Sequence, residues 1–496
     1  MVTLAGFVGS SPPDALVQAL RRRFDETRSP KNLGLIFIAC VGNSKGGGHD
    51  VLAAEGLVSH ITYGWLGNCL GLGGLIRENK VAAHNLPLGV VSHLIRARAA
   101  GRGGVLSPIG TGTFVDPAQT GGKRNARTTS EVVTRVEVDG ESLLYYRAPR
   151  SIDVALLRGT TADLDGNVSF EKEALYVDQL NQAMAAHNSG GLVIVQVERV
   201  VDRHSLPSRA VHLPGVLVDR VVVAPPHLHP QSYAAAVADG ALSGEVRAPL
   251  HSLGRLPMNE RKVMAHRAFL EITAPNSLVN LGVGVPEGVA MLKASHGHQN
   301  PAAASATLTT EAGVFGGVPA GGARFGSGFN PEALVPTATM IDLYSGGGID
   351  VCVLGMAETD AGGNVNVHNF GVRAPGCGGF IDISQSAKKC IFAGTFTTGG
   401  LKVAIRDGRL AILHEGKKRK FVKNVLEKTF AALPTDHRPI FYVTERCVFV
   451  PTEDRKTLEL VEVAPGVDIQ KDILALMDFT PVVRDVKLMD ARIFEP

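Results

Sequence analysis

One acidic residue of this chain stands where a strand-like run ends and a glycine-rich loop begins. The run Ala306-Thr-Leu-Thr-Thr leads directly to Glu311, and seven glycines follow between residues 313 and 328. Because glycine has no side chain, such a loop lets a bulky ligand and the main chain approach each other closely. The pattern therefore puts a carboxylate beside a candidate binding loop. A surface glutamate ahead of a flexible loop is the alternative, and this segment alone does not decide between them.

Two further glycine loops could bind anionic or polar groups through their main chain. The segment Gly282-Val283-Gly284-Val285-Pro286 follows an apolar run and precedes a helical one, and N–H groups at the start of a helix suit phosphate or pyrophosphate. The segment Gly376-Cys377-Gly378-Gly379-Phe380 lies ahead of an apolar run, where main-chain N–H groups could point at a developing oxyanion. A tight structural turn explains either loop equally well.

Other candidate sites are weaker. Gly42-Asn-Ser44-Lys-Gly46 has the letters of a nucleophile elbow, but more glycines follow it instead of a helix. The pairs His227/His229 and His296/His298 lack helical i, i+4 spacing and nearby acids, so we expect solvated histidines and no metal site.

Elements that would position these loops alternate along the chain. Runs rich in β-branched residues indicate buried parallel strands at Leu33–Val41, Val154–Leu157, Leu192–Val197, Val216–Val223, Val351–Leu354 and Cys390–Ala393. Helical apolar spacing occurs at Pro13–Arg23, Gly89–Ala99, Glu173–Ala186, Glu260–Ile272 and Glu287–Ala294. The alternation predicts an α/β architecture with open, mostly parallel sheets.

The chain also repeats itself. Residues 151–170 align without gaps on residues 348–367, an offset of 348 minus 151, or 197, with eight of twenty positions identical. The offset persists where Leu192–Val195 falls on Lys389–Phe392. We therefore predict two copies of one domain, at residues 1–250 and 251–496, with a linker inside 224–257 and the active site between the halves.

Composition narrows the class of protein. The 496 residues carry a formal net charge of only +3, with no basic run interleaved with aromatics, which disfavours a nucleic-acid binder. No apolar run is long enough to span a bilayer, and no signal peptide is evident. The six cysteines show no metal-like or C-x-x-C spacing, a pattern typical of a reducing compartment. These features predict a cytoplasmic protein that binds no membrane.

Several co-linear motifs resemble the family I CoA-transferases. In the second half these are Asn280–Pro286, Thr309-Thr-Glu311-Ala-Gly, residues 355–367 and Gly376–Phe380. In the first half, residues 110–117, 158–167, 172–174 and 188–198 are similar to the acetate/propionate CoA-transferase branch, in which α and β halves are fused. The resemblance covers nearly the whole chain.

The resemblance implies an enzyme that moves CoA between a short-chain acyl-CoA and a free carboxylic acid in ping-pong fashion. It implies a catalytic glutamate at Glu311 that forms a glutamyl-CoA thioester, oxyanion donors at Gly378 and Gly379, and CoA-binding main chain at Gly282–Pro286. It further implies CoA as substrate with no permanently bound cofactor, and a homo-oligomer, either dimer or tetramer.

Two positions depart from the family pattern. Leu88 and Glu358 stand where glutamine is common, and the first of those glutamines helps to form the oxyanion hole. The departures leave open a CoA-thioester hydrolase or a carbon–carbon lyase on the same fold, which would release CoA without an acceptor acid. A CoA-binding protein with little turnover would bind CoA without exchange.

The chemistry of transfer suits a glutamate. An ester on serine lies well below a thioester in energy and tends to end in hydrolysis, whereas a carboxylate forms an anhydride and a thioester, both high in energy. With an ordinary pKa near 4.3, we expect Glu311 to be ionised at neutral pH and to need no general base.

Overall fold

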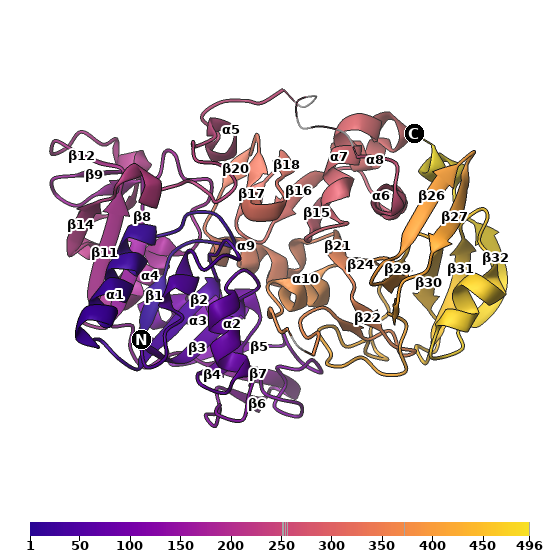
Figure 1. The fold of residues 1–496 in the computed structure, drawn as a ribbon, viewed down its shortest axis with the longest axis horizontal. Coiled ribbons are helices and arrows are strands. Elements are labelled where there is room, and N and C mark those ends of the chain that lie inside the picture. Colours follow the sequence, from indigo (N-terminus) through magenta and orange to yellow (C-terminus); the bar gives the residue numbers. More distant parts are fainter. Residues whose placement is uncertain (250–251, 253, 255, 372, 496) are drawn as a thin grey trace. The chain divides into compact units, whose positions relative to one another are not determined.

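The computed structural model describes residues 1–249, 252, 254, 256–371 and 373–495 (Figure 1). These residues form two compact units that interleave along the chain. Unit 1 comprises Met1–Ala248, Thr310–Asp342 and Val372–Asp382, and unit 2 comprises Pro249–Thr309, Leu343–Gly371 and Ile383–Pro496. The predicted boundary between residues 250 and 251 lies outside the described residues, and the division into two halves stays a prediction.

Unit 1 is built on a parallel sheet with the strand order β14-β11-β8-β1-β2-β3-β4. The strands are β1 (Val2–Leu4), β2 (Leu33–Ala39), β3 (Val58–Trp65), β4 (Ala82–Asn85), β8 (Val154–Arg158), β11 (Leu192–Val197) and β14 (Arg220–Val223).

Helices cover both faces of this sheet. Side chains of α1 (Asp14–Thr27) and α2 (Leu70–Arg77) share one apolar cluster with Leu35 and Phe37 of β2. Side chains of α3 (Leu88–Ala99) share another with Ile36 and Ile38, and so do those of α4 (Gln179–His187). Because successive residues of a strand face opposite sides, a strand covered on both faces is apolar throughout.

Smaller elements complete unit 1. An antiparallel sheet has the order β5-β7-β6, and another the order β12-β9-β10-β13. The segment Thr310–Asp342 contributes two antiparallel pairs, β17 with β20 and β18 with β19, and most of α9 (Thr337–Leu343). The short strands are β5 (Gly104–Ser107), β6 (Val133–Val138), β7 (Glu141–Arg147), β9 (Thr161–Asp163), β10 (Val168–Ser169), β12 (Arg199–Val201), β13 (Val211–Leu213), β17 (Val314–Phe315), β18 (Val318–Pro319), β19 (Gly328–Phe329) and β20 (Ala333–Leu334).

Unit 2 contains a mixed sheet. Strands β16, β15, β21, β24 and β29 lie parallel in that order, and β30, β31 and β32 extend the edge with antiparallel and parallel pairings. These strands are β15 (Leu278–Leu281), β16 (Thr307–Thr310), β21 (Val351–Gly355), β24 (Lys389–Ala393), β29 (Ile440–Val443), β30 (Cys447–Pro451), β31 (Leu458–Val463) and β32 (Val482–Leu488). Helices α6 (Glu260–Leu270), α7 (Glu287–His296) and α8 (Pro301–Ser305) belong to the same unit.

Both units form the same turn where the sequences align. The Asn167 side chain donates to Asp163 over 3.0 Å, and the Asn364 side chain donates to Asp360 over 3.0 Å. The glycine inside each turn has a positive φ, +83° in the first copy and +81° in the second. The internal repeat and the mostly parallel α/β fold predicted from the sequence are therefore present in the structure.

The predicted strands and helices are confirmed, and their bounds differ most from the prediction at β14 and α4. Strand β14 begins only at Arg220, because residues 215–217 form a 3-10 turn after Pro214. Helix α4 begins at Gln179, because Glu173 and its neighbours form turns in which the Glu173 carboxylate pairs with Arg158.

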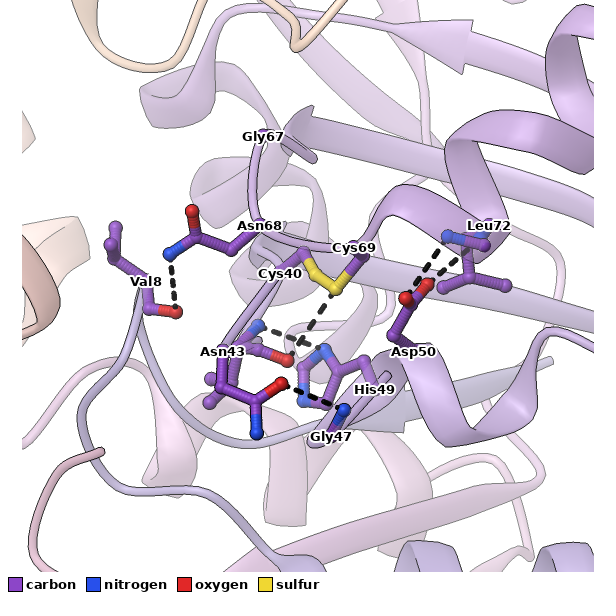
Figure 2. Close-up of a disulfide and its surroundings, with 12 residues drawn as sticks. Val8, Cys40, Asn43, Gly47, His49, Asp50, Gly67, Asn68, Cys69 and Leu72 are labelled. Carbon is purple, nitrogen blue, oxygen red and sulfur yellow. Dashed lines mark hydrogen bonds between the residues drawn. A yellow bond between two sulfur atoms is a disulfide. The ribbon is translucent and has the colours of Figure 1, made fainter. Parts of the chain in front are cut away.

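One pair of cysteines is joined, although their spacing is typical of a reducing compartment. Cys40 and Cys69 form a disulfide, whereas Cys352, Cys377, Cys390 and Cys447 are free (Figure 2). The parallel pairing of β2 with β3 brings the two together, since Cys40 donates its main-chain N–H to Trp65 just before Cys69. A separation of 29 residues hides this neighbourhood in the sequence.

Candidate functional site

Glu311 lies where β16 ends in a tight turn. The Gly313 N–H donates to the Thr310 carbonyl over 3.1 Å, which closes the turn around the acid. Gly313 has a φ of +110°, and a Cβ atom there would overlap the carbonyl oxygen of Val335. Glycine is therefore required at this position, and the turn fixes the place of the carboxylate.

Burial changes the acidity of Glu311. The residue is only 6% exposed, and burial raises its pKa to about 7, against a smaller opposing contribution from its own main-chain N–H. Its Oε2 atom has no hydrogen-bond partner among the residues that the structure describes. The expectation of an ordinary, fully ionised glutamate is therefore wrong, because sequence does not reveal desolvation.

The glycine segment Gly376–Phe380 is held within unit 1 by the ends of β3 and β4. The Asn85 side chain accepts from the Cys377 N–H over 3.0 Å and donates to the carbonyls of Tyr63 and Gly64 over 3.0 and 2.7 Å. A Cβ atom at position 376 would lie 2.7 Å from the Gly64 oxygen. Glycine at this position therefore permits a close main-chain contact.

The two predicted oxyanion donors differ. The Gly378 N–H donates to the Gly64 carbonyl over 3.0 Å, while its own carbonyl accepts from the Leu88 N–H over 2.9 Å. For the Gly379 N–H, no acceptor is recorded in the described part of the chain. An oxyanion role in this segment thus rests on Gly379, and it stays a prediction.

Leu88 opens α3 and is 1% exposed, packed in the apolar cluster of that face. The helix has no side-chain cap from its own N-cap residue, Pro87. The first N–H groups of the helix have other acceptors instead. The Leu88 N–H donates to the Gly378 carbonyl, and the Gly89 N–H donates to Oδ2 of Asp382 over 3.0 Å. The side chain at position 88 is therefore part of the core.

Sequence reasoning missed Asp382. This carboxyl is 1% exposed, and burial together with the nearby charge of Glu311 raises its pKa to about 7. Its Oδ1 atom, like Oε2 of Glu311, has no hydrogen-bond partner among the described residues. The signal was an acid inside the apolar run Phe380-Ile-Asp-Ile.

In unit 2, the loop Gly282–Pro286 follows β15 and leads into α7. Val283 is 59% exposed, and Gly284 has a φ of +87° with nothing within 4 Å of a Cβ position. The Gly284 N–H donates to the Glu287 carboxylate over 2.9 Å. A carboxylate already lies at this helix start, so a phosphate would meet a negative charge there.

The neighbouring strand ends of unit 2 add a glycine and a lysine. Gly355 ends β21 with no atom closer than 3.9 Å to a Cβ position. Beyond β24, a Cβ at Gly394 would lie 2.7 Å from Nζ of Lys420, a residue that is 7% exposed. Burial lowers the pKa of this lysine to about 8. Ligands in open α/β sheets bind at the carboxyl ends of the strands.

The Glu358 carboxylate accepts two hydrogen bonds from neighbouring residues. Its Oε2 atom accepts from the Asn366 side chain over 2.9 Å and from the Leu426 N–H over 3.1 Å. Two donors suit a carboxylate, which accounts for an acid at this position.

The candidate serine nucleophile and the two histidine pairs do not form catalytic or metal-binding groups with their neighbours. Ser44 is exposed, and its hydroxyl donates a hydrogen bond to the Asn68 side chain. The nearby His49 does not act on Ser44, because both of its ring nitrogens contact main-chain groups. His229 contacts Gln196, and His296 lies 5.5 Å from the His266 ring. Among the described residues, no three His, Cys, Asp or Glu side chains are grouped to hold a metal ion.

Comparison with known proteins decides the family. Residues 1–224 match the coenzyme A transferase family. The acetate CoA-transferase YdiF of Escherichia coli K12 is 42% identical over 482 residues, or 97% of this chain and 89% of the relative. The chain belongs to the coenzyme A transferases. It is 43% identical to the caffeate CoA-transferase of Acetobacterium woodii over 99% of this chain and 94% of that one.

A solved coenzyme A transferase has the same fold over the full length. The crystal structure of YdiF from Escherichia coli O157:H7, a thioester complex with CoA, superimposes with a TM-score of 0.92 at 39% identity, covering 100% of this chain and 93% of that one. The protein is thus an enzyme that transfers CoA, and CoA is its substrate. In the described ranges, no helix is both long and apolar enough to cross a bilayer.

Proposed function

We propose that this enzyme is an acyl-CoA:carboxylate CoA-transferase that works through covalent intermediates on Glu311. The observation that carries the proposal is a buried carboxylate, fixed by a glycine turn at a strand end, with one oxygen unbound among the described residues. The related YdiF has been crystallised as a thioester complex with CoA. A glutamyl-CoA thioester on Glu311 agrees with both observations.

The reaction begins when a Glu311 oxygen attacks the acyl-CoA carbonyl and expels CoA thiolate, giving a mixed anhydride. The thiolate then attacks the glutamyl carbonyl, and the first carboxylate leaves with that oxygen of Glu311. The acceptor acid attacks the Glu311–CoA thioester, and the same steps in reverse release the new acyl-CoA. No free energy of the thioester is lost, because each intermediate is as reactive as the substrate.

The environment of Glu311 suits a nucleophile that must not meet water. Removing a carboxylate from water strengthens the electrostatic interactions around it, and exclusion of water prevents hydrolysis of the anhydride and the thioester. The cost is a raised pKa, so that about half of the Glu311 side chains are ionised at pH 7. The Gly379 N–H is the proposed oxyanion donor.

For CoA, the proposed binding loop is Gly282–Pro286. The exposed Val283 and the open space beside Gly284 suit the uncharged amides of pantetheine, because the Glu287 carboxylate at the helix start disfavours a phosphate there. The buried ammonium of Lys420 is the proposed partner of an anionic group of CoA. Gly355, at the end of the neighbouring strand, leaves room for the ligand.

The acids exchanged and the assembly are also part of the proposal. One relative is named for acetate and another for caffeate, so both a short-chain and an aromatic acid belong in a substrate panel. We propose a short-chain acyl-CoA as donor and a homo-oligomeric enzyme.

Mass spectrometry of the intact enzyme tests the proposal. Incubation with acetyl-CoA or caffeoyl-CoA, without acceptor acid, should add the mass of CoA minus water, and peptide mapping should place it on Glu311. Borohydride should reduce the thioester to an alcohol and abolish exchange. An adduct elsewhere, or CoA release without an acceptor and without any adduct, would contradict the transferase mechanism and favour a hydrolase.

A further inference from the structure

A buried lysine of unit 2 carries a charge that nothing around it matches. Lys420 is 7% exposed, and its Nζ atom makes no hydrogen bond or ion pair with the residues that the structure describes. A Cβ atom at Gly394 would lie 2.7 Å from this Nζ and 2.5 Å from the Met356 carbonyl oxygen. Since Met356 follows β21 and Gly394 follows β24, the ammonium lies at the carboxyl ends of both strands, where open α/β sheets bind ligands.

The acid whose charge reaches Lys420 is already paired. Burial lowers the pKa of Lys420 to about 8, against an opposing contribution from Glu445, so the lysine is still charged at pH 7. The two Glu445 oxygens accept from the Arg446 guanidinium over 2.7 Å and from the Phe396 N–H over 2.8 Å. A buried charge without a direct partner is costly, and an anionic ligand would offset that cost.

Beyond Gly394 the chain forms a short antiparallel ribbon that leads to a second lysine. Strand β25 (Thr397–Thr398) pairs with β28 (Lys418–Arg419). Lys418 is exposed, whereas Lys420 is buried beside Gly394. The ribbon therefore runs outward from the strand ends, with Lys420 at its inner end and Lys418 at its outer end.

The two lysines face the same side of this ribbon. Arg419 and Phe421 both contact the segment 478–479, through a hydrogen bond of 2.8 Å and a pair of rings with centroids 6.5 Å apart. Because successive side chains of an extended chain face opposite sides, Lys418 and Lys420 share the other side, about 7 Å apart along the chain. In the described part of the chain, Lys418 also has no ion-pair partner.

The spacing of the strands suits the length of CoA. The proposed pantetheine loop follows β15, and Gly394 follows β24, two strands away across β21. At about 4.8 Å between neighbouring strands, Gly282 and Gly394 are roughly 10 Å apart. The pantetheine arm of CoA ends in a pyrophosphate, and one ribose carries both this pyrophosphate and the 3′-phosphate. Two lysines about 7 Å apart suit two phosphate groups on one sugar.

We propose that the ribbon of β25 and β28 binds the nucleotide end of CoA, with Lys420 on the pyrophosphate and Lys418 on the 3′-phosphate. This inference rests on the proposed function, in which CoA lies at the strand ends of unit 2. Lys418 thereby distinguishes CoA from dephospho-CoA, which lacks the 3′-phosphate. Both contacts are ionic, and neither involves a covalent step.

Calorimetry with CoA and 3′-dephospho-CoA tests the outer contact in the complete enzyme at low ionic strength. The wild type should bind CoA about fivefold more tightly than dephospho-CoA, the upper range for an exposed ion pair. Lys418→Gln should remove this difference by weakening the binding of CoA alone, and added salt should reduce it in the wild type. Equal affinities in the wild type, or an unchanged difference in Lys418→Gln, would overturn the proposal.

Lys417 provides a matched control. It is exposed and has the same charge, and its N–H donates to the Gly399 carbonyl over 3.3 Å, which continues the ribbon by one residue. Its side chain therefore falls on the side of Arg419. Lys417→Gln removes the same net charge and should keep the fivefold difference. If this variant loses the difference as well, the basic run acts through its net charge and the assignment of Lys418 is wrong.

Lys420→Met tests the inner contact. Both ligands keep the pyrophosphate, so both affinities should fall by the same factor, about tenfold, and their ratio should stay at about five. A changed ratio would place the 3′-phosphate on Lys420 and overturn the proposed order. Absence of a CoA adduct on Glu311 in mass spectrometry refutes the proposed function instead. An adduct in an enzyme that binds both ligands equally refutes only the phosphate site.

Discussion

The carboxyl end of strand β8 is blocked in the first copy of the repeat, whereas the carboxyl end of its counterpart β21 is open in the second. In unit 1, β8 ends at Arg158, whose buried guanidinium pairs with Glu173 at 2.9 Å and donates to the carbonyls of Pro12 and Pro230 over 3.0 and 2.8 Å. The offset of 197 places Gly355 at the same position in unit 2, where no side chain lies within 3.9 Å of a Cβ position. A structural ion pair in one copy thus occupies the place that is open to a ligand in the other.

The ends of the two adjacent strands also differ between the copies, with glycine in the second copy only. Ala5 and Gly282 correspond, because each donates its N–H to the equivalent carbonyl of the next strand, over 3.0 Å to Leu156 in unit 1 and over 2.9 Å to Val353 in unit 2. Val197 corresponds by the offset to Gly394. Glycine occurs at each of these strand ends in unit 2 and at none of them in unit 1.

Glu311 in the second copy of the repeat corresponds to an apolar residue in the first. Val2 pairs with Leu35 in unit 1, and Val279 pairs with Leu308 in unit 2. Ile38 lies three residues after Leu35, inside strand β2. Glu311 lies three residues after Leu308, just past the end of strand β16. The reactive group thus follows a strand of the second copy of the repeat, although Glu311 itself belongs to unit 1.

The largest effect should come from removing that group. Glu311→Gln should abolish exchange, since a neutral amide is a poor nucleophile, and Glu311→Asp should lower kcat at least a hundredfold because the shorter side chain withdraws the carboxylate by about 1.5 Å. CoA affinity, measured by calorimetry, should be unchanged in both. More than a few per cent of wild-type exchange in Glu311→Gln would assign the nucleophile to another residue.

The ion pair of unit 1 should matter for stability. Arg158→Met leaves Glu173 buried and unpaired, so we expect a loss of about 3–5 kcal/mol in the free energy of unfolding, measured with urea. The double variant Arg158→Met/Glu173→Leu should recover most of this loss. A single variant as stable as the wild type would show that the pair does not block the strand end tightly.

Glu311 itself should cost stability at high pH. Its pKa is raised from 4.5 to about 7 by folding, so the unfolded chain loses the proton first and stability falls as the pH rises from 4.5 to 7. Over that window the wild type should lose about 3 kcal/mol relative to Glu311→Gln. Thermal unfolding of both proteins at pH 5 and pH 8 measures the difference, and parallel curves would contradict it.

Closing the open strand end should weaken ligand binding. Gly355→Val adds a side chain where unit 1 has Arg158, and we expect the Kd for CoA to rise ten- to a hundredfold, which corresponds to the 1–3 kcal/mol typical of overpacking. Leu157→Ile, at a core position of the equivalent strand in unit 1, is the control and should leave the Kd unchanged. An unaffected Kd in Gly355→Val would place CoA elsewhere.

The smallest predicted effect concerns Lys420. Lys420→Met keeps the length of the side chain and removes the charge, and the Kd for CoA should rise about tenfold, as expected for one hydrogen bond to a charged group. The wild-type affinity should also fall above pH 8, where the lysine loses its proton. If pantetheine, which lacks the adenosine and all the phosphates of CoA, loses the same factor, the lysine binds no anionic group of CoA.

Sequence patterns predicted the repeated framework but not the environment of the acid. Two kinds of local signal carried that prediction. One is the apolar runs that form β2, β11 and β21. The other is the four-residue spacing of Asp163 and Asn167, which recurs in Asp360 and Asn364. Residues within a few positions of each other determine them. They could therefore be read without knowing the tertiary contacts.

The missed features all depend on contacts between distant segments. Asp382 meets Gly89 across 293 residues of chain, and Cys40 meets Cys69 through the pairing of two strands. The burial that raises the pKa of Glu311 is a property of the folded chain. No spacing rule along the sequence contains this information.

The interleaving of the two units sets an order of events during synthesis. Unit 1 lacks two of its segments until Asp382 has left the ribosome, which is 382 minus 248, or 134, residues after Ala248. At about 5–20 residues per second, the delay is roughly 7 to 27 seconds. Throughout that interval Asp382, the capping partner of α3, is still unmade, and the segment from β17 to β20 is made only part-way through it. The nascent first half therefore exposes apolar surface to chaperones for longer than a contiguous domain of its size would.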